Sequence, residues 1–97
     1  MKIKILPSAI NDLSEGFYFY ENQLKGLGSY FLESLFSDID SLKLYAGLHE
    51  KVFEHYRLLS KRFPYAVYYS YESNTVFVNA VLDCRRNPDW IEKRLDT

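Results

Sequence analysis

The sequence predicts one small α+β domain, in which an N-terminal edge strand and an α-helical hairpin precede a three-stranded antiparallel meander and a short C-terminal helix. Three observations support this fold class. In the first half of the chain, apolar residues recur at spacings of three and four, as they do along one face of a helix. After Gly47 the period changes to two, and β-branched and aromatic residues become frequent, as in strands. Because the chain has 97 residues, it has room for a single domain, spanning 1–97.

The chain is expected to begin with an edge strand and a helix. "KIKIL" alternates lysine with isoleucine and is followed by Pro7, which is typical of a half-buried strand at the border of a sheet. Ser8 is the expected N-cap of the helix, which continues for about four turns. The stripe predicted along its buried face consists of Ile10, Leu13, Phe17, Tyr20 and Leu24.

A second helix is expected to run back along the first. Gly26 and Gly28 end the first helix and start the next one near Ser29, and Gly47 offers its C-cap. Since the link is short, the two helices form an antiparallel hairpin that covers one face of the sheet. Its predicted buried face consists of Phe31, Leu35, Ile39 and Leu42, widened by Leu32 and Phe36.

Three strands and a helix are expected in the second half. "HYRLLS", "AVYYSYE" and "TVFVNAVLD" have the composition of strands, and Pro64 separates the first two. Ser73 and Asn74 form a tight turn between the last two, because Asn tolerates a positive φ. Asn87 is the expected N-cap of the terminal helix, and Pro88 is its first residue.

The composition argues against several functional classes. A net charge of −1 gives no general attraction to nucleic acid, so we expect no direct DNA binding by the chain alone. The sequence has no run of about 18 apolar residues, so we expect a soluble, cytoplasmic protein with no membrane contact. The single Cys84 agrees with a reducing compartment. Nine Tyr and seven Phe are more than a domain of this size is expected to bury, which indicates an interface.

The arginines are concentrated in the second half, where their planar guanidinium groups suit phosphate or carboxylate oxygens. Arg85 and Arg86 follow the last strand, and the pleat is expected to send them to opposite faces. A phosphate site, a protein contact surface, and ion pairs with Asp83, Asp89 or Glu92 are all compatible with this pair. If the sheet order makes their strands neighbours, the basic residues converge on one region; they are Arg57, Lys61, Arg62, Arg85 and Arg86.

Several enzyme signatures are missing from the sequence. It has no phosphate-binding glycine loop, no nucleophile elbow, and no His or Cys cluster at metal spacing, so we expect no cofactor and no metal. His49 and His55 are either a general base with its helper or two solvated residues. The acidic residues of the second helix, Asp38 among them, are expected on a solvated face. Asp83 lies beside the arginine pair, but an unperturbed Asp is a weak base at neutral pH.

Short motifs extend in order over nearly the whole chain. They are carried by Ala9, Asp12, Leu13, Tyr20, Glu21, Gly26, Leu27, Gly28, Phe31, Arg57, Arg62, Phe63, Pro64, Tyr65, Tyr68, Tyr69, Ala80, Val81, Leu82, Arg85, Arg86, Pro88, Trp90 and Arg94. No single motif is specific, but in this order and spacing they resemble the RelE/ParE superfamily, the toxin halves of bacterial type II toxin–antitoxin pairs.

The resemblance implies the fold described above and a toxin that inhibits growth until an antitoxin covers its surface, as in plasmid stabilization systems. RelE-like members bind the ribosomal A site and cut mRNA with lysines, arginines and a C-terminal Tyr or His. ParE-like members act on DNA gyrase. This sequence departs from the RelE-like pattern: Asp83 stands where relatives often have histidine, the tail "IEKRLDT" has no Tyr or His, and the net charge is −1.

These departures favour a noncatalytic ParE-like inhibitor of DNA gyrase. The alternatives are a ribosome-dependent endoribonuclease and a degenerate toxin that only binds its antitoxin and represses its own operon. The antitoxin is expected in an apolar or aromatic groove exposed by the helical hairpin and the sheet edge. The expected contacts to antitoxin or target are Arg57, Arg62, Arg85, Arg86, Trp90, Tyr18 and Phe19. A nuclease would instead use Arg57, Lys61, Arg62 and Arg85.

Overall fold

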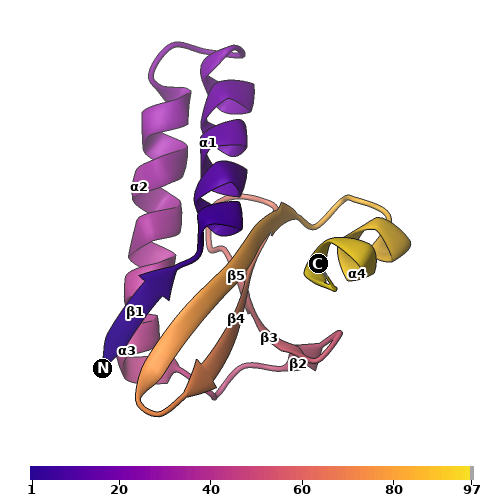
Figure 1. Ribbon diagram of the computed structural model, residues 1–97. Helices are drawn as coiled ribbons and strands as arrows, with labels where there is room; N and C mark the ends of the chain where they lie inside the picture. Colours follow the sequence, from indigo (N-terminus) through magenta and orange to yellow (C-terminus); the bar gives the residue numbers. More distant parts are fainter. Residues whose placement is uncertain (97) are drawn as a thin grey trace.

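A computed structural model of the chain describes residues 1–96. One five-stranded sheet, in the order β1-β5-β4-β3-β2, is covered on one face by the hairpin of α1 and α2, and α4 packs on the other face (Figure 1). The expected α+β fold is confirmed. The elements are β1 (Lys2–Ile5), α1 (Pro7–Glu21), α2 (Leu27–Asp40), α3 (Leu42–Tyr45), β2 (Lys51–Val52), β3 (His55–Leu59), β4 (Tyr65–Glu72), β5 (Thr75–Asp83) and α4 (Pro88–Leu95).

The sheet contains the predicted meander and one strand that the sequence did not indicate. As expected, β3, β4 and β5 pair antiparallel and β1 lies at the sheet edge. The parallel pairing of β1 with β5 was not predicted. The tight turn at Ser73 and Asn74 is also confirmed, with φ values of 50° and 60°. The additional strand, β2, has two residues and reaches β3 through Phe53 and Glu54, both with positive φ. Such a turn commonly contains Gly or Asn, so these two residues gave no turn signal.

The start and the buried face of α1 differ from the prediction. The helix begins at Pro7 with Leu6 as its N-cap, and the Ser8 hydroxyl donates instead to the Asn79 carbonyl at 3.2 Å. Ile10 is 55% exposed and Leu24 lies beyond the helix end. The predicted Leu13 and Tyr20 do face inward, together with Ala9, Asp12 and Gly16, and a Cβ on Gly16 would lie 2.5 Å from the Phe31 ring of α2.

The helical hairpin is held by a carboxylate and two glycines. Glu21 accepts hydrogen bonds from the backbone N–H groups of Gly26 at 3.0 Å and Gly28 at 2.9 Å. A Cβ on Gly28 would lie 2.7 Å from the Phe17 carbonyl oxygen, so only glycine fits there. The spacing of the Tyr-Glu and Gly-Leu-Gly motifs therefore has a local structural cause.

The second helix buries four of its six predicted residues and is shorter than expected; of the two that were to widen the buried face, Leu32 is half-buried and Phe36 is 46% exposed. Phe31, Leu35, Ile39 and Leu42 are all buried. α2 ends at Asp40, and the chain continues as the separate short helix α3 instead of one helix reaching Gly47. Their packing on β4 and β5 forms the larger core, which places the outer face of the hairpin in solvent.

A smaller core joins α4 to the opposite face of the sheet. The start of α4 is as predicted, with the Asn87 side chain accepting from the Asp89 N–H at 2.8 Å and Pro88 as first residue. None of the helices within residues 1–96 has the length and apolar character needed to cross a membrane. The smaller core consists of Ala66, Tyr68, Ala80, Leu82, Ile91 and Leu95, with Val52 and Phe53 beside it.

Candidate functional site

Arg85 is held by its neighbour Asp83. The Asp83 carboxylate accepts from the Arg85 backbone N–H at 2.8 Å, from Nε at 3.0 Å and from Nη2 at 2.8 Å. These contacts hold the pKa of Asp83 below its ordinary value, since hydrogen bonds from Arg85 favour the charged form. Of the ion pairs considered for the two adjacent arginines, the one between Arg85 and Asp83 is thus present. The lowered pKa also makes the Asp83 carboxylate a poor proton acceptor.

Arg86 has a different partner from Arg85. Its guanidinium lies 4.1 Å from the centre of the Trp90 ring, a cation–π contact. The strand ends at Asp83, so the pleat does not set the direction of either arginine. The contacts to Asp83 and Trp90 set these directions instead.

Arg57 lies on the α4 face of the sheet. It pairs across β3 and β4 with Tyr68, a member of the smaller core, and cross-strand partners point to the same face. Burial raises the pKa of the Tyr68 phenol, and the nearby Arg57 opposes this increase. Glu50 Oε2 lies 3.7 Å from Arg57 Nη2.

The predicted basic residues lie toward one end of the sheet, but each arginine whose contacts are described has a different partner: Glu50 for Arg57, Asp83 for Arg85 and Trp90 for Arg86. β4 lies between β3, which carries Arg57, and β5, which leads to Arg85 and Arg86. Lys61 and Arg62 are exposed in the connection between β3 and β4. The end of the sheet where β4 begins and β5 ends therefore carries Lys61, Arg62, Arg85 and Arg86, and Arg57 lies on the neighbouring strand β3.

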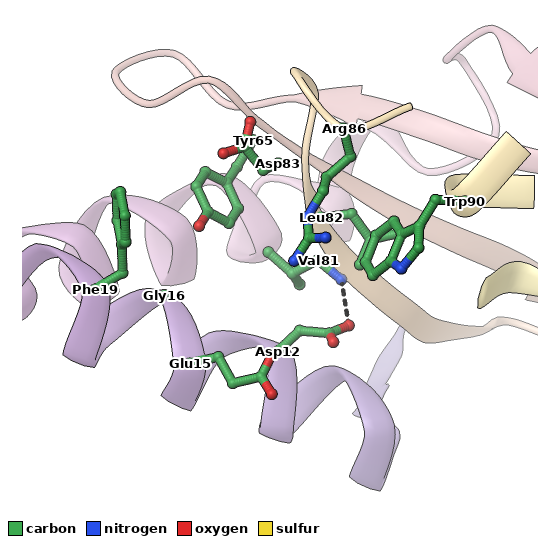
Figure 2. Close-up of a pocket in the computed structure, with 10 residues that line it drawn as sticks. All are labelled: Asp12, Glu15, Gly16, Phe19, Tyr65, Val81, Leu82, Asp83, Arg86 and Trp90. Carbon is green, nitrogen blue, oxygen red and sulfur yellow. Dashed lines mark hydrogen bonds between the residues drawn. The ribbon is translucent and has the colours of Figure 1, made fainter. Parts of the chain in front are cut away.

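A cavity of about 320 Å³ lies where α1, the end of β5 and the start of α4 meet (Figure 2). We call it the α1–α4 cavity. It contains Arg86, Trp90 and Phe19 from the predicted contact set. Its lining consists of Asp12, Glu15, Gly16, Phe19, Tyr65, Val81, Leu82, Asp83, Arg86 and Trp90.

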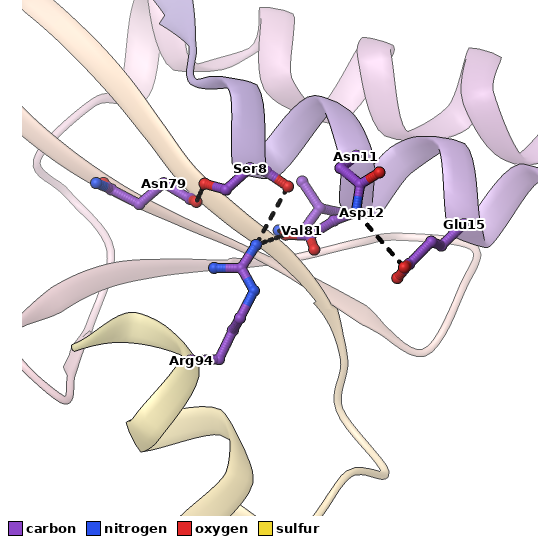
Figure 3. A network of polar contacts seen from close by, with 7 residues as sticks. All are labelled: Ser8, Asn11, Asp12, Glu15, Asn79, Val81 and Arg94. Carbon is purple, nitrogen blue, oxygen red and sulfur yellow. Dashed lines mark hydrogen bonds and ion pairs between the residues drawn. The ribbon is translucent and has the colours of Figure 1, made fainter. Parts of the chain in front are cut away.

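A buried polar network borders this cavity (Figure 3). Asp12 is 7% exposed, and its Oδ2 accepts from the Val81 N–H at 3.0 Å and from Arg94 at 2.7 Å. Arg94 also donates to the Ser8 carbonyl at 3.2 Å. Burial raises the pKa of Asp12, and the bonds from Val81 and Arg94 oppose this increase. Sequence reasoning noticed Asp12 and Arg94 only as motif positions, because residues 82 apart give no local signal of a contact.

A second, apolar hollow of about 460 Å³ lies between β1, α1 and α2. We call it the hairpin groove. Tyr18 lies in it, and both Tyr18 and Phe19 are exposed, but Phe19 faces the α1–α4 cavity instead. The groove is lined by Ile5, Ile10, Leu13, Ser14, Phe17, Tyr18, Leu32 and Phe36.

The two histidines have separate partners. His49 Nδ1 lies 2.6 Å from the Tyr69 hydroxyl, which also accepts from the Gly47 N–H at 3.0 Å. The direction of the bond between the Tyr69 hydroxyl and His49 Nδ1 is set by the imidazole tautomer, because the hydroxyl can donate to one group and accept from two. Burial lowers the pKa of His49. His55 Nδ1 contacts the Phe53 carbonyl, so the two histidines do not act as a base with its helper.

Asp38 is a further correction. It was expected on a solvated helix face, but it is buried and accepts a hydrogen bond from the Ser60 hydroxyl at 2.7 Å. Asp38 therefore ties α2 to the loop after β3. Within residues 1–96, no three His, Cys, Asp or Glu side chains gather as metal ligands would.

Comparison with known proteins bears on the fold. No protein-family profile matches the chain, and no curated protein sequence matches it significantly. The structure is similar to a chain of the solved structure described as "Chromosomal ParDE TA system from P. aeruginosa", with a TM-score of 0.75 and 14% sequence identity. The similarity covers 84% of this chain and 92% of that chain. The chain thus has the fold of a component of a ParDE toxin–antitoxin system, which is the fold that the RelE/ParE resemblance implied.

Proposed function

We propose that this chain is the toxin of a type II toxin–antitoxin pair, which inhibits growth when free and is neutralised by a cognate antitoxin in the cytoplasm. The shared fold with a ParDE chain supports this proposal, together with the ordered motifs that resemble the RelE/ParE superfamily. Within this class we propose a noncatalytic inhibitor of DNA gyrase.

The distribution of the arginines is the observation that favours a noncatalytic toxin. Cleavage of RNA through its 2′-hydroxyl needs a base, an acid and cations around one phosphate. Arg57 and Arg85 are separated by β4, and Arg85 is already bound by Asp83. Arginines held by separate partners, Glu50 for Arg57, Asp83 for Arg85 and Trp90 for Arg86, suit contacts across a protein surface better than joint binding of a single phosphate.

The hairpin groove is the proposed docking site of the antitoxin. Its lining is predominantly apolar, and Ile10, Tyr18 and Phe36 expose large apolar side chains there. An amphipathic helix that lays its apolar face into such a groove would bury these side chains. Exposed apolar area of this kind is costly in water and is reduced by a partner.

Induction in growing bacteria tests the proposal. We expect growth to stop, plasmid supercoiling to fall and ribosome-bound mRNA to remain intact. Coexpression of the antitoxin, sought as a short open reading frame beside the gene, is expected to restore growth.

Two results would point elsewhere. Cleavage of mRNA on ribosomes that disappears in Arg85→Ala or Arg62→Ala would establish the endoribonuclease alternative. Normal growth after confirmed accumulation of the chain would indicate a degenerate toxin that binds its antitoxin and represses its operon.

A further inference from the structure

Two hydrogen-bond donors in the α1–α4 cavity have no acceptor within residues 1–96. Tyr65 is only 8% exposed, and Figure 2 shows its hydroxyl directed into the cavity toward α1. Arg86 reaches into the same cavity and contacts the Trp90 ring with its guanidinium, without an ion-pair partner in the described chain. The Tyr65 hydroxyl is open to the cavity, because Ser34 Oγ is the buried side-chain polar atom that lacks a partner within residues 1–96. A ligand in the cavity can therefore reach both donors.

The carboxylates that line the cavity do not supply the missing acceptor. Asp83 is bound three times by Arg85, and Asp12 is bound by Val81 and Arg94. Only Glu15 lacks a cationic partner among the described residues; its one hydrogen bond, from Asn11, is 3.5 Å long. Apart from Glu15, the two unmatched groups described above, the Tyr65 hydroxyl and the Arg86 guanidinium, are therefore donors.

We propose that the α1–α4 cavity binds the carboxylate of an acidic side chain presented by a partner protein. The Arg86 guanidinium and the Tyr65 hydroxyl donate to the carboxylate oxygens, and the rings of Trp90 and Phe19 flank the methylene groups. Charge-assisted bonds from a guanidinium to a carboxylate are among the stronger hydrogen bonds in proteins. The partner is the antitoxin, so this assignment of the source rests on the proposed function.

The properties of the two donors fit this ligand. Burial, reinforced by Tyr20 and Asp83, raises the pKa of Tyr65 to about 12, so the phenol keeps its proton at neutral pH. The volume of about 320 Å³ is at the lower end of ligand cavities, which suits one side chain. The Glu15 carboxylate, which also lines the cavity, repels a bound anion. Removing its charge should therefore strengthen binding, whereas removing the charge of Arg86 should weaken it.

The probe is N-acetyl-glutamate amide, with the neutral isostere N-acetyl-glutamine amide as its control. Trp90 is the chain's single tryptophan, so its indole N–H resonance reports directly on the cavity in NMR titrations of the full chain. We expect saturable shifts with the glutamate derivative, with a Kd on the order of millimolar, and none with the glutamine derivative.

Three variants, each of which removes one polar or charged group, test whether these groups bind the carboxylate. Arg86→Gln and Tyr65→Phe are expected to weaken binding of the glutamate derivative by about tenfold. Glu15→Gln is expected to strengthen it by about twofold. Lys25→Gln, which removes an exposed cation outside the cavity and outside the predicted contact set, is the control and should leave binding unchanged.

The outcomes separate the cavity from the proposed function. The carboxylate assignment would be overturned if the chain bound the glutamate and glutamine derivatives equally well. It would also be overturned if Glu15→Gln bound the glutamate derivative more weakly than the parent does. If inorganic phosphate bound more tightly than the glutamate derivative, the ligand of the cavity would be a free oxyanion and not a side-chain carboxylate, and the proposal would be wrong. If an antitoxin neutralises the parent and the Arg86→Gln variant with equal affinity, the cavity is not its contact, although the toxin function stands.

Discussion

Asp12 of α1 and Arg94 of α4 form an ion pair of 2.7 Å between residues 82 positions apart. The same carboxylate oxygen accepts from the Val81 N–H in β5. One buried oxygen therefore joins the helical hairpin, the sheet and the terminal helix. The α1–α4 cavity lies beside this junction, so its shape depends on the position of α4.

Replacing Asp12 tests the junction. Asp12→Asn is expected to reduce the free energy of unfolding by about 2 to 3 kcal/mol, because it leaves Arg94 without its buried countercharge. Urea unfolding measures this change. Asp40→Asn removes the partner of an exposed pair with Lys43 and is expected to cost less than about 0.5 kcal/mol. Equal losses in the two variants would refute the special role of Asp12.

His49 gives the stability a pH dependence of known sign. Its pKa is lowered in the folded protein, so the unfolded chain takes up the proton first as pH falls. The contribution of neutral His49 to the free energy of unfolding is complete above the ordinary pKa of 6.5. It is lost as the pH falls from that value through the lower pKa of the folded protein. Urea midpoints between about pH 8 and about pH 5.5 should fall less in His49→Gln than in the parent. The same slope in both proteins would contradict this.

The larger elements of the fold followed from local patterns, but the junctions did not. β5 was predicted with its observed bounds because its apolar alternation is long, and the turn at Ser73 and Asn74 because Asn tolerates positive φ. The two-residue β2 was missed because it is too short to show a period. The buried face of α1 was wrong at Ile10, since the close contact of Gly16 with Phe31 of α2 turns the face with Ala9, Leu13 and Tyr20 inward and leaves Ile10 55% exposed.

Gly28 is expected to be intolerant of a side chain. The Cβ of Gly28→Ala would lie 2.7 Å from a backbone oxygen of α1, so the helices must separate, at a cost of about 1 to 3 kcal/mol. Gly26→Ala is the matched control: its Cβ meets open space and its cost of about 1 kcal/mol comes from the positive φ of 92°. Thermal unfolding compares the two. A Gly26 variant less stable than the Gly28 variant would contradict the close contact.

Phe36 is expected to contribute to antitoxin binding without supporting the fold. It is 46% exposed and lines the hairpin groove, so Phe36→Ser should weaken antitoxin affinity by about tenfold or more and leave the free energy of unfolding almost unchanged. Leu24→Ser, at a 66% exposed position outside the groove, is the control for calorimetric titration. Equal affinity in the two variants would exclude the groove as the docking site.

The candidate site could be predicted only in part. Sequence reasoning selected Arg86 and Trp90, which the structure places in contact, and it gave the ion pair of Arg85 with Asp83 as an alternative. It did not select Tyr65 as a cavity residue. Tyr65 belongs to a run rich in tyrosine, and only the tertiary structure distinguishes the hydroxyl that lacks a partner.

Supercoiling by purified DNA gyrase in the presence of the purified chain tests the central claim most directly, with a parallel reaction that follows mRNA on translating ribosomes. A noncatalytic gyrase inhibitor predicts that supercoiling stops and that the mRNA stays intact. Unaffected supercoiling together with mRNA cleavage that Arg85→Ala abolishes would contradict it.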